Sequence, residues 1–368
     1  MTDARRFAAL PTPFTMQRGG TLPQGRVAFE TWGTLNAAKD NTLLLFTGLS
    51  PSAHAASSAL DSAEGWWEDM VGPAKALDTN RWFVVCINSL GSCFGSSGPA
   101  SPKPGGEQPW RLEFPELSVE DIARAGYETL RTLGITRPAV VAGASLGGMV
   151  VLAFVGLYPG CAHRLVSISG TAAASPSAIA LRSVQREAIL RDPQWRGGNY
   201  PTDQPPRSGM SLARKLGTIT YRSPMEWNER FGRSPLAAEF SERVAIAPEF
   251  AAEFAIEGYL EAQAVKFASS FDANCYLYLS RAMDRFDLAQ HGPSVEETFR
   301  RAKLQDALIV GVETDMLFPI GEQRLLADAL RAAGVPTTFQ PLQCREGHDA
   351  FLVDIAQFSA VIAPFLRA

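Results

Sequence analysis

The apolar residues of this chain gather into short runs that predict buried β-strands. Four runs precede residue 175: 41–48 (NTLLLFTG), 81–89 (RWFVVCINS), 138–145 (PAVVAGAS) and 163–170 (HRLVSISG). Two more follow near the C-terminus, at 306–315 (DALIVGVETD) and 336–342 (PTTFQPL). Because these runs are continuous and do not alternate with polar residues, they are typical of strands covered on both faces.

Helical patterns lie between the strands and complete an α/β arrangement. In 118–134, apolar residues recur every three to four positions, Ser118 can cap the N-terminus, and Gly134 can end the helix. Strands that alternate with helices predict a mostly parallel central sheet with helices on both of its faces.

This alternation is interrupted in the middle of the chain. The block 175–300 is helical and polar-aromatic, without a convincing strand, and strand character returns only at residue 306. A helical block inserted between two parts of one sheet indicates a lid and not a separate folding domain. We therefore predict an α/β core formed by 1–174 and 301–368, with a helical lid at 175–300.

The third strand-like run ends in a motif that carries chemistry. The segment GASLG, from Gly143 to Gly147, has the form G-x-S-x-G and stands between a buried strand and an apolar helical segment at 149–159. Ser145 on such a strand-to-helix turn holds its hydroxyl clear of the sheet, as a nucleophile requires. The glycines let strand and helix approach without Cβ clashes, and the Leu146 N–H can face the oxyanion.

A serine nucleophile on this fold takes its partners in the chain order serine, acid, histidine. The chain has four histidines, His54, His163, His291 and His348. Only His348 follows the last strand-like run and precedes a terminal helical segment, 350–368. We therefore predict His348 as the general base.

The acid and the second oxyanion donor are also predicted from residues at the ends of predicted strands. Asp315 ends the run 306–315 and is predicted to orient the imidazole and stabilise the imidazolium, with Glu313 as its competitor. Leu49, in the turn FTGLS (46–50) after the first run, is the candidate for the second N–H of the oxyanion hole.

Composition narrows the expected partners and cofactors. The net charge is −4 and no Lys/Arg-rich run is present, so no nucleic-acid partner is expected. No apolar stretch reaches the ~18–20 residues of a membrane span, and no leader is recognisable. The five cysteines show no CxxC spacing, which argues against disulfides and metal sites. We expect a cytoplasmic protein with reduced thiols, no membrane partner and no metal.

Several longer motifs are more specific than the pentapeptide. They are TWGTLN (31–36), VGPAKALDTNRWFVVCINSLGSCFGSSGPASP (71–102), GASLGGM (143–149), ARKLGTITYRS (213–223), NCYLYLSRAMDRFDL (274–288), TDMLFP (314–319) and GHDAFL (347–352). Together they span nearly the whole chain and resemble the homoserine O-acyltransferases of the α/β-hydrolase superfamily. The resemblance implies ping-pong acyl transfer from acyl-CoA, a substrate, to an amino-acid hydroxyl. It implies no cofactor, and a homodimer formed through the lid helices.

The resemblance also assigns residues outside the triad. Arg214, in ARKLGTITYRS, matches the arginine expected to bind the amino-acid carboxylate, a task that suits a guanidinium fork. Asp349, next to His348, matches the carboxylate expected to hold the substrate ammonium. Tyr221 is expected to line the tunnel to the nucleophile.

One turn departs from the pattern usual among homoserine acetyltransferases. They carry an acidic turn of the type TGDSH, whereas this chain has TGLSPSAH at 47–54. This turn resembles the serine O-succinyltransferase branch, which implies L-serine as acceptor and succinyl-CoA as donor. Pro51, Ser52, Ala53 and His54 are then expected to narrow the acceptor pocket, because serine is one methylene shorter than homoserine.

A succinyl group also brings a free carboxylate, which needs a cation because a buried unpaired charge is costly. Arg186, in the segment 177–189, is the candidate for that cation, with a solvent-exposed helix charge as the alternative. Homoserine O-succinyl- or O-acetyltransferase remains the alternative activity. Esterase action and a non-catalytic binding module are more remote alternatives.

Overall fold

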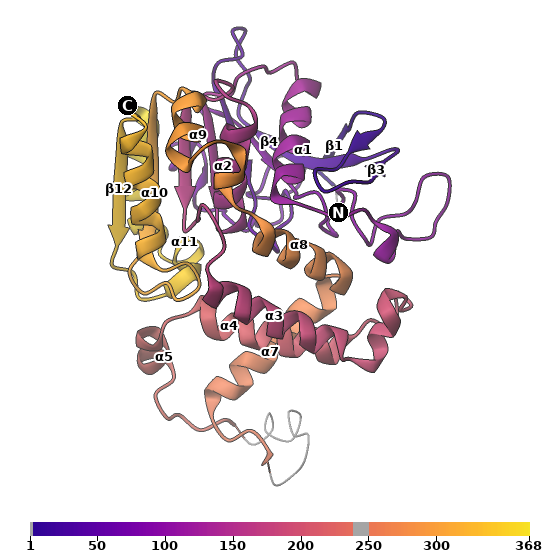
Figure 1. The fold of residues 1–368 in the computed structure, drawn as a ribbon. Helices are drawn as coiled ribbons and strands as arrows, with labels where there is room; N and C mark the ends of the chain where they lie inside the picture. The colour runs from indigo at the N-terminus through magenta and orange to yellow at the C-terminus, as the bar shows by residue number, and fades with distance from the viewer. Residues whose placement is uncertain (1–2, 238–249) are drawn as a thin grey trace.

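The computed structural model describes residues 3–237 and 250–368, and its centre is a mixed eight-stranded sheet (Figure 1). In spatial order the strands are β1 (Arg6–Ala9), β4 (Arg26–Trp32), β8 (Phe83–Ile87), β5 (Thr42–Phe46), β9 (Val140–Ala144), β10 (Arg164–Ile168), β11 (Asp306–Val312) and β12 (Thr337–Leu342). The pairs β1–β4 and β4–β8 are antiparallel, and all other neighbours are parallel. The predicted α/β class with a mostly parallel sheet is confirmed.

All six strand-like runs of the sequence form strands of this sheet, whereas the sequence pattern does not predict β1 and β4. In β1 three of the four residues are exposed, and Glu30 and Thr31 interrupt the apolar run of β4. β1 is a mostly exposed edge strand, and β4 is buried on both faces but contains polar residues, so each gives a weaker apolar signal.

The two faces of the sheet are covered by different layers. In β5, Leu44 and Phe46 pack into one core with α1, α2 and α10, while Leu43 and Leu45 pack into a second core with α12. The helices of these layers are α1 (Val119–Thr132), α2 (Leu146–Leu157), α9 (Val295–Ala302), α10 (Ile320–Ala332), α11 (Ala350–Val353) and α12 (Ile355–Arg367). Each fully buried leucine or phenylalanine contributes about 1.5–3 kcal/mol to folding, so the four apolar residues of β5 that follow Thr42 stabilise both layers.

The expected cap of the first long helix is present. The Ser118 hydroxyl accepts a hydrogen bond from the Asp121 N–H, and the Asp121 carboxylate accepts one from the Ser118 N–H, which closes a capping box at α1. Gly134, at φ +68°, follows the last turn of α1. The predicted ends of this helix are therefore confirmed.

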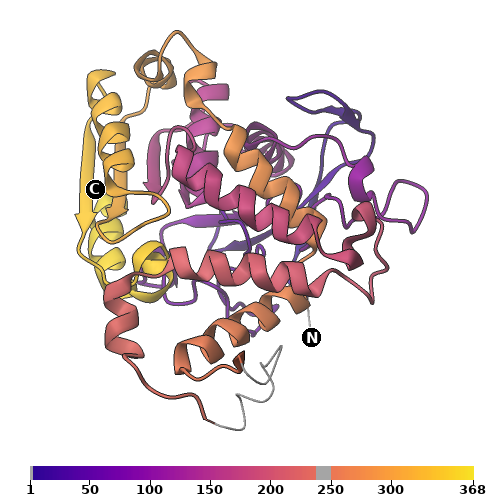
Figure 2. The same ribbon diagram turned by 60° about the horizontal axis from the view of Figure 1, so that its bottom comes forward.

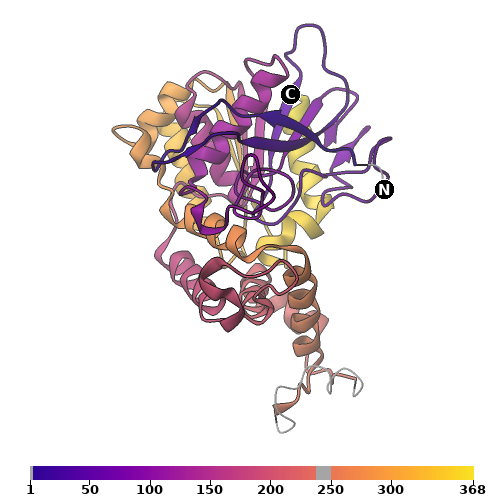
Figure 3. The same cartoon turned by 90° about the vertical axis from the view of Figure 1, so that its right-hand side faces the viewer.

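The described helices between β10 and α9 gather at one end of the sheet. They are α3 (Pro176–Leu190), α4 (Arg207–Tyr221), α5 (Pro224–Arg230), α7 (Ala255–Ser270) and α8 (Ala273–Arg285). Figure 1 shows them beneath the sheet, Figure 2 shows α3 and α4 across its end, and Figure 3 shows them projecting from that end. The named elements of 175–300 are all helical in the described part, and residues 238–249 of the predicted lid lie outside it.

The exact lid boundaries stay a prediction. The predicted boundary at residue 300 falls inside α9, a helix that packs against α2 and α10 of the core.

Short elements complete the described chain. They are the strand pairs β2 (Phe14–Thr15) with β3 (Thr21–Leu22) and β6 (Val71–Gly72) with β7 (Leu77–Asp78), and the 3-10 turns η1 (Arg111–Glu113), η2 (Pro193–Gly198), η4 (Leu288–His291) and η5 (Gly347–Asp349). Within the described ranges, no single helix is long and apolar enough to cross a membrane. Only the segments 347–353 and 355–367, bent by 73°, reach that composition together.

Candidate active site

Ser145 lies at the sharp turn between β9 and α2. Its backbone adopts φ 57° and ψ −119°, a region that residues with a side chain rarely occupy, and its N–H donates to the Ile168 carbonyl at 2.9 Å. A Cβ on Gly143 would lie 2.3 Å from the Gly147 oxygen, and a Cβ on Gly147 would lie 2.3 Å from the Phe46 oxygen. Both glycines are therefore required by close backbone approach.

A chain of buried hydrogen bonds connects Ser145 to residues that follow two other strands. His348 Nε2 lies 2.8 Å from Ser145 Oγ, and His348 Nδ1 lies 2.7 Å from Asp315 Oδ2. The other carboxylate oxygen of Asp315 accepts the N–H groups of Leu317 and Phe318, both at 2.9 Å. These bonds fix the carboxylate, which in turn orients the imidazole for proton transfer from the serine.

The surroundings of His348 adjust its basicity. Burial alone would lower the pKa of His348, but the adjacent Asp315 carboxylate, by its charge and hydrogen bond, raises that pKa above the ordinary value. The ring stacks on Phe318 at 5.1 Å and meets Phe351 edge-on at 5.9 Å. Glu313, the alternative acid, is exposed and does not take this place.

The two proposed oxyanion donors come from the residue after the nucleophile and from the turn after β5. Leu146 is the first residue of α2, where helix geometry leaves the N–H without an intrahelical acceptor. Leu49 follows β5 and lines the same pocket as Ser145. Their roles as donors remain predictions from the fold.

Ser145 lines a pocket between the core and the lid, here called the central pocket. Its core wall includes Gly48, Leu49, Ser50, Pro51, Leu317, His348, Asp349, Phe351 and Leu352, and its lid wall includes Leu181, Arg182, Gln185, Arg214, Tyr221, Tyr276 and Met283. The lid thus supplies most of the cationic and aromatic groups that face the nucleophile.

The three residues assigned by resemblance all line this pocket. The Arg214 guanidinium lies over the rings of Phe267 at 4.7 Å and Tyr221 at 5.4 Å, and its buried Nε has no hydrogen-bond partner among the described residues. Burial raises the pKa of the Asp349 carboxyl, and Arg222, whose Nε lies 3.5 Å away, opposes that rise. Arg214 and Asp349 together offer one cation and one carboxylate to a ligand.

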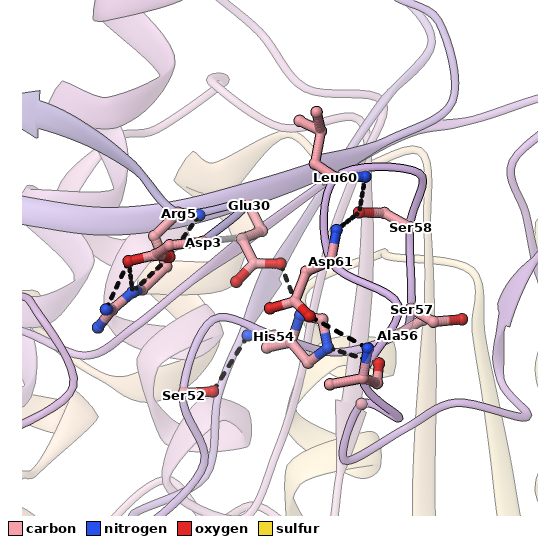
Figure 4. Close-up of polar contacts among 12 residues, drawn as sticks. Asp3, Arg5, Glu30, Ser52, His54, Ala56, Ser57, Ser58, Leu60 and Asp61 are labelled. Atoms are coloured by element: carbon pink, nitrogen blue, oxygen red, sulfur yellow. Dashed lines mark hydrogen bonds and ion pairs between the residues drawn. The ribbon is translucent and has the colours of Figure 1, made fainter. Parts of the chain in front are cut away.

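The turn 47–54 is brought only partly into the central pocket. Pro51 lines it, whereas Ser52, Ala53 and His54 do not. His54 turns instead toward Glu30, with its Nδ1 2.8 Å from Glu30 Oε2 and its Nε2 2.9 Å from the Ala63 oxygen (Figure 4). Any influence of these three residues on the acceptor would therefore act through the shape of the turn.

Arg186 lies outside the central pocket, contrary to the expectation of direct contact with the acyl group. Its guanidinium pairs with Asp284 at 2.6 Å and donates to the Ser280 hydroxyl at 2.9 Å. It lines a second cavity on the outer side of α3 and α8, together with Trp195 and Tyr278. The reason is helical phase, because Arg186 follows Arg182 by four residues and therefore points about 40° further round α3.

Arg182 takes the place in the central pocket that Arg186 was expected to fill, and the sequence analysis missed it. It belongs to the buried stripe of α3 formed by Ala178, Arg182, Gln185 and Ile189. This spacing of four, three and four residues is a sequence signal for one helix face. An arginine on such an otherwise buried face could have been singled out.

One group of metal-ligand type occurs in the described residues outside this pocket. Ligand atoms of Cys344, Glu346 and Asp354 lie within 4.8 Å of one another. Asp354 already accepts the Gln357 N–H at the start of α12. The expectation that the protein needs no metal stays a prediction.

Known proteins resemble this chain over its full length. A family model described as the alpha/beta hydrolase fold matches residues 41–335. The serine O-succinyltransferase of Litchfieldella anticariensis is 54% identical over 367 residues, which cover 100% of this chain and 99% of that protein. The protein of the same name from Stenotrophomonas maltophilia is 54% identical over 364 residues, with 99% and 97% covered.

Solved structures show the same similarity of fold. A homoserine O-acetyltransferase from Bacillus anthracis superposes with a TM-score of 0.88 at 26% identity and covers 99% of this chain and 97% of its own. Esterase E22 superposes with a TM-score of 0.87 at 27% identity and covers 98% and 99%.

This chain has the α/β-hydrolase fold. Its nucleophile, Ser145, is hydrogen-bonded to the base His348, which is hydrogen-bonded to Asp315. Within that class, the chain belongs to the homoserine O-acyltransferase family, beside the relatives named serine O-succinyltransferase.

Proposed function

We propose that this protein is a serine O-succinyltransferase, which moves the succinyl group of succinyl-CoA to the hydroxyl of L-serine. The observation that carries the proposal is 54% identity over the whole chain to proteins of that name. The hydrogen-bonded chain from Asp315 through His348 to Ser145 supports it, as do the cation of Arg214 and the carboxylate of Asp349 in the same pocket.

The first half-reaction acylates the enzyme. His348 Nε2 accepts the proton of Ser145 Oγ, and Oγ attacks the thioester carbonyl of succinyl-CoA. The N–H groups of Leu146 and Leu49 stabilise the oxyanion. The carbon–sulfur bond then breaks, the CoA thiolate leaves with the proton from His348, and a succinyl ester remains on Ser145.

The second half-reaction repeats the geometry with an alcohol in place of the serine side chain. Arg214 binds the carboxylate of L-serine and Asp349 its ammonium, so that the substrate hydroxyl faces His348. His348 removes the hydroxyl proton, the oxygen attacks the acyl-enzyme carbonyl, and the proton returns to Ser145 as O-succinyl-L-serine leaves. The carboxylate that holds the imidazole acts identically in both halves.

Hydrolysis of the acyl-enzyme is the competing reaction, and one observation favours it as the second candidate function. Esterase E22 has nearly the same fold as this chain. Transfer requires that the acceptor reach the acyl-enzyme and that water be excluded. Aromatic and aliphatic lid residues, including Tyr221, Tyr276 and Met283, stand over the nucleophile and support the exclusion of water.

The proposal also includes a setting for the enzyme. The product, an activated serine ester, suits cysteine biosynthesis, where sulfide displaces the succinate to give cysteine. A cytoplasmic location accords with five free cysteines and with CoA as the acyl carrier. A homodimer formed through the lid accords with exposed apolar side chains on its helices, among them Leu212, Ile219 and Val265.

A two-by-two kinetic test decides the function. The purified enzyme is offered succinyl-CoA or acetyl-CoA, each with L-serine or L-homoserine, and CoA release is followed while mass spectrometry identifies the ester. We expect kcat/KM to be highest for succinyl-CoA with L-serine, by about tenfold or more, which corresponds to about 1.4 kcal/mol of transition-state discrimination.

The controls of this test separate the alternatives. Preference for homoserine would identify a homoserine acyltransferase, and CoA release that continues over many turnovers without any acceptor would identify a hydrolase. Ser145→Ala should abolish CoA release in every combination, whereas Ser183→Ala, at an exposed site of α3, should not change it. Activity that survives in Ser145→Ala would refute the acyl-serine route.

A further inference from the structure

We propose that Arg182 binds the free carboxylate of the succinyl group while that group is attached to Ser145. This inference rests on the proposed function and adds the residue that selects the acyl donor. It is carried by the contacts of Arg182, by the charges of the central pocket, and by the way in which Asp284 holds the guanidinium.

The guanidinium of Arg182 is buried but incompletely bonded. The residue is 4% exposed, and its Nε donates to Asp284 Oδ1 at 2.6 Å. Its two terminal nitrogens, Nη1 and Nη2, are buried and have no hydrogen-bond partner among residues 3–237 and 250–368. Arg182 also lines the central pocket that contains Ser145.

A fork of this kind calls for an anion. Buried donors without acceptors are costly, and the cost is removed when a ligand supplies them. Two parallel N–H groups of a guanidinium match the two oxygens of a carboxylate. With Nε fixed by Asp284, the remaining two nitrogens are oriented before the ligand arrives.

The charges of the pocket match the charges of the proposed substrates. Apart from the base His348, the described lining residues include two cations, Arg182 and Arg214, and one carboxylate, Asp349. When the succinyl-enzyme meets L-serine, the ligands bring two carboxylates and one ammonium. If Arg214 and Asp349 hold the amino acid, the second carboxylate belongs to the succinyl group and Arg182 is the cation left for it.

The neighbouring cluster keeps the positive charge of Arg182 available. Asp284 is shared between Arg182 and Arg186, so these three side chains have a net charge of +1. Both terminal nitrogens of Arg186 are engaged, one by Asp284 and one by Ser280. Arg186 therefore acts as a positioning residue, which draws part of the Asp284 charge away and holds that carboxylate against Arg182.

The test compares donors that differ in the carboxylate. Arg182→Met and Arg182→Lys are assayed with L-serine and either succinyl-CoA or butyryl-CoA, which has a similar chain length and no terminal charge. In Arg182→Met, kcat/KM for succinyl-CoA should fall about 100-fold or more, the scale expected when one partner of a buried charge pair is lost. For butyryl-CoA it should change less than about threefold or rise, since the ligand then has no charge to pair.

Two further readouts separate donor binding from acceptor binding and from misfolding. Acylation of Ser145 by succinyl-CoA without L-serine, followed by protein mass, should slow in Arg182→Met and recover in part in Arg182→Lys. The KM for L-serine should stay within about threefold in Arg182→Met and rise in Arg214→Met, in line with the two separate carboxylate sites. Arg281→Met, at an exposed arginine of α8, is the matched control and should leave the donor preference unchanged.

The outcomes distinguish this inference from the proposed function. If the wild-type enzyme does not use succinyl-CoA, both are wrong. If it does, but Arg182→Met loses both donors equally or neither, the assignment of Arg182 alone is refuted. Loss of succinyl preference in Arg186→Met with preference retained in Arg182→Met would likewise refute it and transfer the role to Arg186.

Discussion

At the scale of single residues, the chemistry depends on one imidazole held between two oxygens. His348 contacts Ser145 Oγ on one side and the Asp315 carboxylate on the other, in a buried environment. Only the neutral imidazole can accept the serine proton, so the protonation state of His348 sets the fraction of active enzyme. Asp315 raises the pKa of His348 against the effect of burial.

We therefore predict a specific pH dependence. As pH falls through the raised pKa of His348, kcat/KM for succinyl-CoA should fall, and this acid limb should lie at higher pH than for an unperturbed histidine. In Asp315→Asn the limb should move to lower pH, because the raising charge is gone, and kcat should drop by about 10³–10⁴. Stopped-flow measurement of CoA release from pH 5 to 9 tests the position of the acid limb and the fall in kcat. If the acid limb lay at the same pH in Asp315→Asn as in the wild type, the role assigned to Asp315 would be contradicted.

At the scale of elements, the junction of β9 with α2 is the most constrained part of the fold. Ser145 sits at positive φ between two glycines that touch the neighbouring backbone. α2 is buried almost all round, so it cannot shift to relieve a clash. The same rigidity holds the serine hydroxyl in line with His348.

Gly147→Ala should destabilise the protein by about 3 kcal/mol or more, because its methyl group would lie 2.3 Å from the Phe46 oxygen in a packed core. The free energy of unfolding from urea denaturation measures this effect.

A matched control is available in a helix that packs against the same sheet. Gly321→Ala in α10, where nothing lies within 4 Å of the added carbon, should be neutral or stabilise by up to about 1 kcal/mol. Equal stability of the two variants would show that the junction is more compliant than its geometry indicates.

At the scale of the whole molecule, the active site exists only where lid and core meet. The core supplies the nucleophile, base and acid, and α3, α4 and α8 supply the cations and aromatic rings that face them. The outer surfaces of the lid helices expose large apolar side chains, with Leu212 58% and Val265 55% exposed on the packed pair α4 and α7. Grouped exposed apolar side chains mark interaction surfaces.

We predict that the protein is a dimer in solution and that Leu212→Asp with Val265→Asp converts it to a monomer, because charged side chains would be buried at the interface. Light scattering after gel filtration measures the mass. Leu60→Asp, at an exposed leucine of the core, is the control and should stay dimeric. A monomeric wild-type protein would refute the prediction.

The sequence alone showed which predicted strand each catalytic residue follows. Apolar runs identified the strands, and Ser145, Asp315 and His348 all follow such runs, at the edge where parallel strands end. The sequence pattern does not predict the antiparallel strands β1 and β4, because β1 is mostly exposed and the buried strand β4 contains Glu30 and Thr31. The motifs that identify the family are also local in sequence, and they indicated Arg214, Asp349 and Tyr221 as binding residues without the structure.

Only the tertiary structure decided which arginine of α3 faces the nucleophile and which way His54 points. Arg182 and Arg186 are one helical turn apart, and their separation into two cavities depends on how α3 packs against α8 through Asp284. His54 is drawn from the pocket by Glu30, a residue of β4 that is distant in sequence. Local patterns determine where strands and catalytic turns begin and end, whereas the rotation of a helix and the partner of a buried charge follow from contacts between distant segments.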